Sequence, residues 1–245
     1  MVLLGHTAHA ILRSHSTVKC SWARITIILS FLLLSTIGFA QQEYVSRYDA
    51  FTGFSYLASP KLNLYQRGFN GEFGVNVRRW LALGGDYSIL TGNSSILPKE
   101  LDPKIQAELA PFAPLLPPGY NLYVPFHATT QTFSAGPQIN FRHWKPVTIF
   151  VRPALGAIHE AVTPKPIDPI QSAVVNALAP SGHKYDTTFF YGVGGGFDIN
   201  ASRHVGLRVG VDYVHTFLFE GFLAEARNSV RISVGPTFRF GSNVK

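Results

Sequence analysis

The chain has 245 residues, a formal net charge of +7, 46% hydrophobic residues and only 14% charged residues. Soluble domains usually carry about 25% charged residues. The low charge, together with 22 Gly, 19 Phe and 10 Tyr, argues against a disordered chain and against an ordinary helical enzyme. A β-rich fold remains, and the shortage of charge favours one that faces lipid.

The first forty residues have the order of a secretory signal peptide. Basic residues without any acid come first, and an apolar run follows from 25 to 39. Small residues at 38 and 40 fit a signal peptidase, so we expect cleavage between Ala40 and Gln41. The alternative is a membrane anchor, but the run is shorter than the roughly 20 residues that span a bilayer.

Residues 41–245 are then the mature protein, which we interpret as one domain. They keep 18 of the 21 basic residues and all 14 acids, a net charge of +4 that is too mild to indicate nucleic-acid binding. The single cysteine, Cys20, leaves with the leader. The mature chain therefore has no disulfide and no thiolate metal site.

The mature chain alternates between apolar and small or polar residues. From Phe69 to Val77, for example, the odd positions are mainly apolar and the even positions are Asn, Glu, Gly and Asn. Alternation over eight or more residues predicts a strand. The pattern predicts eight strands, at 47–57, 69–78, 81–89, 133–141, 149–156, 189–200, 205–213 and 230–240.

The connections between these strands alternate in length. Three are short (79–80, 143–146 and 201–204), and four are longer (58–68, 91–130, 159–188 and 217–229). Short turns at one end and long loops at the other are typical of an up-and-down antiparallel barrel in the bacterial outer membrane, with the long loops outside the cell.

A soluble sandwich or a lipocalin-like barrel would also alternate. A water-facing sheet, however, normally carries lysine on its outer face. All seven lysines after residue 40 lie in predicted loops, turns or the C-terminal tail, at 61, 99, 104, 145, 165, 184 and 245. The sequence therefore predicts a transmembrane barrel of eight strands.

Both of the longest loops contain a predicted short helix. Each begins with Asp followed by Pro, at Asp102 and at Asp168, which is a favoured helix start. Apolar residues then recur at a spacing of four, at 101, 105 and 109 and at 170, 174 and 178, and each segment stops at a proline. The alternative is a chance pattern in an unstructured loop.

Several segments resemble the small outer-membrane β-barrel family, to which the transmembrane domain of outer membrane protein A belongs. They are the hairpin at 194–208, the pair Asp212-Tyr213 and the ending at 231–241. The resemblance implies an outer-membrane location and the barrel fold. Two features depart from it: the residues that follow Phe240, and prolines inside predicted strands at 137, 153 and 236, where we expect local bulges.

The motif search predicts no catalytic, cofactor or metal site. The glycines that begin at Gly192 lack the last glycine of a dinucleotide motif, and a strand follows them instead of a helix. His159-Glu160 begins like a zinc-protease motif, but the second histidine is absent. Asp212 and His215, near one rim, are the candidate pair if the protein is a lipid-modifying enzyme.

The even-numbered row holds charges that would face the barrel interior. An eight-stranded barrel is only wide enough for side chains to fill, so these charges must be paired. The predicted network is structural, and the alternative is an ion pathway. Its members are Glu72, Arg78, Asp86, Arg152, Asp198, Arg208, Asp212, Arg231 and Arg239.

These features predict a non-enzymatic outer-membrane protein with a structural or surface-contact role. The alternatives are a narrow pore for small solutes and a lipid-modifying enzyme. Trp80 and Trp144, both at short turns, are expected in the periplasmic aromatic girdle. The expected partners are outer-membrane lipid, lipopolysaccharide and the barrel assembly machinery; the expected state is a monomer without cofactor or nucleic acid.

Overall fold

The computed structural model describes residues 44–224 and 228–244. The predicted leader, with Ala40 and Gln41, lies outside the described residues. Within them, no helix is both long and apolar enough to cross a bilayer.

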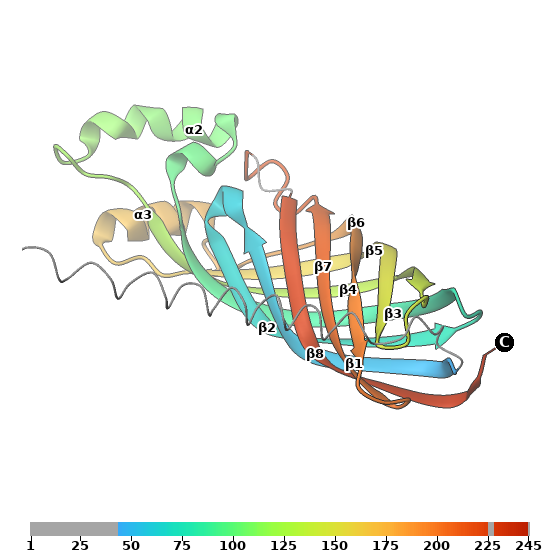
Figure 1. The fold of residues 1–245 in the computed structure, drawn as a ribbon. Helices are drawn as coiled ribbons and strands as arrows, with labels where there is room; N and C mark the ends of the chain where they lie inside the picture. The colour runs from blue at the N-terminus through green and yellow to red at the C-terminus, as the bar shows by residue number, and fades with distance from the viewer. Residues whose placement is uncertain (1–43, 225–227, 245) are drawn as a thin grey trace, which may run out of the picture. The chain divides into compact units, whose positions relative to one another are not determined.

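Eight antiparallel strands form a closed barrel in which each strand pairs with the next and β8 pairs with β1 (Figure 1). This confirms the predicted fold. The strands are β1 (Ser46–Ser59), β2 (Leu64–Asn76), β3 (Leu81–Ile96), β4 (Val124–Phe141), β5 (Val147–Pro164), β6 (Lys184–Asn200), β7 (Val205–Thr216) and β8 (Asn228–Asn243).

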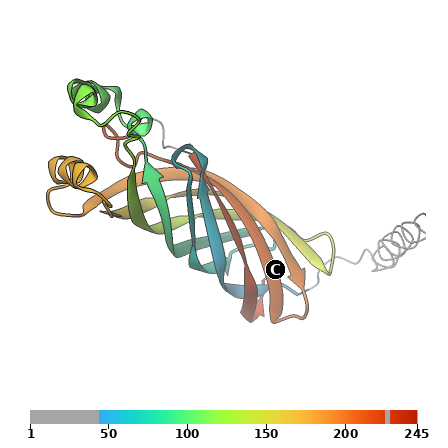
Figure 2. The same cartoon turned by 90° about the vertical axis from the view of Figure 1, so that its left-hand side faces the viewer.

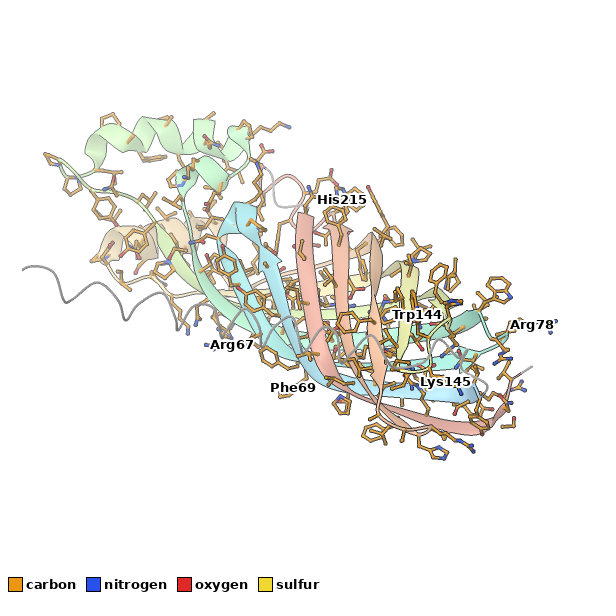
Figure 3. The ribbon with its side chains drawn as sticks, viewed as in Figure 1. Arg67, Phe69, Arg78, Trp144, Lys145 and His215 are labelled. Atoms are coloured by element: carbon orange, nitrogen blue, oxygen red, sulfur yellow. The ribbon has the colours of Figure 1, made fainter. Side chains whose placement is uncertain are left out.

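The alternation of the sequence separates the two faces of the barrel wall. On β2, Phe69 and Phe73 are 67% and 50% exposed, whereas Asn70 and Glu72 between them are buried. Figure 3 shows Phe69 projecting outward from the ribbon. Because neighbouring side chains of a strand point to opposite faces, the apolar row covers the outside and the polar row fills the lumen.

The strands are longer at the long-loop end than the sequence predicts. The region 58–68 is not a long loop: Pro60–Leu62 form a single 3-10 turn (η1), and Asn63 closes it with a φ of 47°. The strands β3 to β6 have 16 to 18 residues, more than the about 9–11 that cross a membrane. Strand pairing continues beyond the apolar outer surface of the barrel, because the backbone hydrogen bonds of a ladder do not depend on the type of side chain.

The prolines lie where two ladders are interrupted. Pairing of β4 with β5 stops after Ala135 and resumes at Ile139, and the register between these points sets Pro137 opposite Pro153. Pro236 lies in a similar gap between β8 and β1. A strand residue donates its backbone N–H to only one of the two neighbouring strands. The N–H that each proline lacks would have pointed into one of these gaps. The prolines therefore occupy gaps in the ladders, not the bulges expected from the sequence.

Both predicted loop helices are present, at the long-loop end of the barrel (Figures 1 and 2). They are α2 (Pro103–Leu109) and α3 (Pro169–Leu178), and the 3-10 turns η2 (Pro98–Glu100) and η3 (Ala110–Leu115) flank α2. Asp102 caps α2 and Asp168 caps α3, each accepting a backbone N–H. The buried residues of α3 are Gln171 and Val175, one position beyond the face that the spacing predicts.

Candidate functional site

The lumen holds an ion-pair network in which Arg231 of β8 contacts carboxylates of two other strands, β3 and β7. Its guanidinium donates to Asp86 on β3 at 2.9 Å and to Asp212 on β7 at 2.9 Å. It also donates to the hydroxyls of Ser88 and Thr132 at 3.3 and 3.2 Å. All five side chains are buried, so Arg231 bridges the barrel interior.

Two further arginines extend the network toward the short-turn end. Arg152 contacts Glu72 at 2.9 Å and Asp212 at 3.1 Å. Arg208 contacts Glu72 at 2.7 Å and Asp198 at 2.8 Å. The planar guanidinium suits this role because it can bond two carboxylates at once and stays charged.

Arg239 completes the network at 2.9 Å from Asp198. The structure thus brings together the predicted lumen residues except Arg78. The prediction for Arg78 is wrong: β2 ends at Asn76, so the side chain is exposed in the turn to β3, and Figure 3 shows it at that end. The alternation in the sequence continues two residues beyond the end of the strand.

Sequence reasoning missed two charged members of this region. Asp49 is buried on β1, 3.6 Å from Arg208, and it accepts a hydrogen bond from Asn76 at 3.1 Å. The Arg142 guanidinium donates a hydrogen bond to the side-chain oxygen of Asn76 at 2.9 Å. The weak alternation of β1 hid Asp49, and Arg142 follows the last residue of β4, where the pattern ends.

The network leaves little open space in the lumen. The Arg208 guanidinium lies 4.8 Å from the ring centre of Phe150 and 5.8 Å from that of Phe51. A space of about 30 Å³ beside Glu72 and Asp86 remains, enough for one or two water molecules. Charged and aromatic side chains therefore plug this part of the barrel.

The tryptophans and the suggested enzyme pair lie elsewhere. Trp80 is 57% exposed in the β2–β3 turn. Trp144 is exposed in the β4–β5 turn, where Figure 3 labels it. Asp212 faces the lumen, but His215 faces outward and bonds Asn228 at 2.7 Å. Because the two side chains point to opposite faces of β7, they do not form a catalytic pair.

A second candidate site, the mouth cavity, lies at the long-loop end. It is a half-open, almost wholly apolar cavity of about 90 Å³. Side chains of both helices line it, with the ends of β3 to β6 and the loop after β7. They include Leu101, Leu109, Val124, Phe126, Val162, Val174, Leu178, Phe219, Phe222 and Leu223.

Specific contacts hold these segments over the barrel. Asp102 donates its backbone N–H to the Phe222 carbonyl at 2.9 Å, so the α2 loop is joined to the loop after β7. The Tyr120 hydroxyl donates to Asp168 at 2.7 Å, so the two helix-bearing loops are joined to each other. The backbone N–H of Gln171, bonded to the same carboxylate, lowers the pKa of Asp168.

Charged groups lie in and beside the mouth cavity. Glu160 of β5 lines it and is only 8% exposed. An open vestibule of about 500 Å³ adjoins the cavity and contains Glu108, Asp186 and Glu220. Lys184 borders both spaces, with its ammonium 3.7 Å from the centre of the Phe222 ring. No sequence motif marks this site, because its residues are scattered from 62 to 223.

No protein-family model and no curated protein matches the chain. Solved structures do match. The outer membrane protein OprG from Pseudomonas aeruginosa is 8% identical, with a TM-score of 0.52, over 82% of this chain and 99% of that one. The attachment invasion locus protein Ail of Yersinia pestis (11%, TM-score 0.45) covers 81% of this chain and 100% of its own. Neisserial surface protein A (15%, TM-score 0.43) covers 79% and 96%.

At these identities the likeness concerns the fold alone. The closed barrel, its apolar outer face and its short turns at one end agree with that likeness. The chain has the fold of the small eight-stranded outer-membrane β-barrels, integral to the outer membrane.

Proposed function

We propose that this protein is a non-enzymatic barrel with a closed lumen, and that it acts at the cell surface through its long loops. The observation that carries the proposal is the ion-pair network across the lumen. Arg152, Arg208 and Arg231 each contact carboxylates of two other strands within about 3 Å. A solute would have to break several buried ion pairs to pass, which is costly.

Conductance in a planar bilayer tests this proposal against the narrow pore. The wild-type protein should give no steady current above that of a bilayer without protein. Replacing Arg231 by Ala should open a leak, because it shortens the side chain that bridges the lumen. Arg203→Ala, at the exposed β6–β7 turn, is the control and should stay silent. A steady wild-type current that Arg231→Ala leaves unchanged would favour the pore.

The outer rim of the long-loop end supports a contact with lipopolysaccharide. Arg67 and His183 are exposed there and His159 and His215 are half-buried, next to exposed tyrosines such as Tyr185. His159 and His183 stack on Tyr185 at 6.1 and 6.0 Å between ring centres. Basic and aromatic side chains at the membrane interface fit phosphorylated headgroups.

We also propose the route by which the protein reaches the membrane. Removal of residues 1–40 would release a chain of 41–245, and the barrel assembly machinery would insert it as a monomer. In support, β8 extends to Asn243 and closes against β1 within the same chain. Incubation with labelled lipopolysaccharide checks the non-enzymatic assignment, and release or transfer of an acyl chain would contradict it.

A further inference from the structure

The mouth cavity contains a buried carboxyl group that forms no ion pair within the described chain. Glu160 is more than nine-tenths buried, and no cation of the described chain forms an ion pair with it. Its neighbours across the two ladders are Thr130 and Asp186. On the same face of β5, Ile158 and Val162 flank it. Burial among such side chains favours the neutral carboxyl form, and a cationic ligand beside it would favour the ionised form.

The contrast with the lumen network shows how unusual Glu160 is. The carboxylates of Glu72, Asp86, Asp198 and Asp212 each lie within about 3 Å of an arginine. Glu160, buried to a similar degree, faces a cavity instead. The nearest lysine along the cavity wall, Lys184, has its ammonium over the Phe222 ring.

The approach to the cavity has the same sign of charge. Glu108, Asp186 and Glu220 line the vestibule, with Lys184 as its one basic residue among the described lining. A cleft with an excess of one charge raises the local concentration of ions of opposite charge. The entrance therefore selects cations, while the cavity behind it selects apolar groups.

We propose that the mouth cavity binds small amphipathic amines, with the ammonium group at Glu160 and the alkyl group among the leucine and valine side chains of α2, α3 and the loop after β7. The volume limits the enclosed part of the ligand. At about 90 Å³ the cavity is smaller than the roughly 150 Å³ that holds a benzene ring, so a short alkyl chain fits.

The test uses n-butylammonium as the probe, with n-butanol and butyrate as uncharged and anionic matches of the same chain length. The full barrel is placed in lipid nanodiscs, and binding is followed by the methyl NMR signals of Val174, Leu178 and Leu223. Val209, on β7 away from the cavity, is the internal reference. Butylammonium should shift the three cavity signals in a saturable way and leave Val209 unmoved.

Two matched variants separate direct contact of the ammonium group with Glu160 from long-range electrostatic attraction by the vestibule. Glu160→Gln keeps the shape of the side chain and should weaken butylammonium binding about tenfold or more, since it removes a charge-assisted hydrogen bond. Glu108→Gln removes one vestibule charge and should weaken binding only slightly, with a loss that disappears at high salt. Butanol should bind both variants and the wild type alike.

Several results would overturn the proposal. The first is that the cavity methyl signals do not move when butylammonium is added. The second is that butyrate or butanol binds as tightly as butylammonium. The third is that Glu160→Gln weakens butylammonium binding no more than Glu108→Gln does. Equal binding of all three probes would instead indicate an acyl-chain site. Folding does not confuse the test, because replacing a buried carboxyl group that has no ion pair by an amide of the same shape should leave the barrel about as stable. The different gel migration of unboiled and boiled samples verifies this for each variant.

Discussion

Replacing Arg231 by methionine is the sharpest test of the lumen network. Methionine is shorter but has a similar volume and no charge, so the change removes the ion pairs while keeping most of the volume. Asp212 retains Arg152 at 3.1 Å after the substitution. Asp86 has no other ion pair in the described network and retains only its hydrogen bond from Ser134. The variant therefore strands one carboxylate in a closed lumen.

The size of the loss follows from that geometry. Arg231 is 4% exposed and Asp86 is 5% exposed, so solvent screens neither. Removing one partner of such a pair costs about 3–5 kcal/mol, because it leaves an uncompensated charge. Arg239→Met should cost less, about 1–3 kcal/mol, since Asp198 keeps Arg208 at 2.8 Å. The double variant Arg231→Met/Asp86→Asn should recover most of the loss.

Urea unfolding in lipid vesicles, followed by far-UV circular dichroism, measures these differences. The gel migration of unboiled against boiled samples gives an independent reading of barrel folding. The reasoning would be refuted if Arg231→Met cost less than Arg239→Met. It would equally be refuted if the double variant were no more stable than Arg231→Met, because the stranded carboxylate would then not be the source of the loss.

Three further predictions concern the outer face, the loops and the leader. Val209→Arg, on the lipid side of β7, should cost about 2–4 kcal/mol by urea unfolding, whereas Ile167→Arg in an exposed loop should cost almost nothing. Because the pKa of Asp168 is lowered by the Gln171 N–H, its stabilisation of α3 is complete above about pH 4 and is lost below it. The protection of α3 amides against exchange, measured relative to the intrinsic exchange rate at each pH, should fall there, and Asp168→Asn should abolish this dependence. N-terminal sequencing of the membrane-embedded protein should begin at Gln41, and an intact leader would contradict the proposed export.

Much of the fold could be predicted from local sequence alone. A strand exposes alternate residues to lipid and lumen, and these environments select opposite chemistries, so the period of two marks each strand and its inner face. Residues such as Phe69 and Asn70 are therefore assigned without any tertiary information. The caps at Asp102 and Asp168 act within three residues, and for the same reason both loop helices were predictable.

The partners of the interior charges depend on the closed barrel. Arg208 and Glu72 are 136 positions apart, and their contact depends on how the strands are staggered around the barrel. Alternation indicates that a charge faces inward, but it does not reveal which carboxylate that charge meets. It also fails where a strand ends, and for this reason Arg78 was misplaced and Asp49 was missed.

The mouth cavity was decided by tertiary structure alone. Its walls come from strand ends and loops whose positions depend on contacts such as Asp102 to Phe222 and Tyr120 to Asp168. In the sequence, Glu160 is one acid in a predicted loop. Only the folded barrel buries it without an ion pair, because strand pairing extends beyond the membrane belt and residues of both helices line the cavity. Burial and the lack of an ion pair are properties of the assembled structure, and no local sequence pattern encodes them.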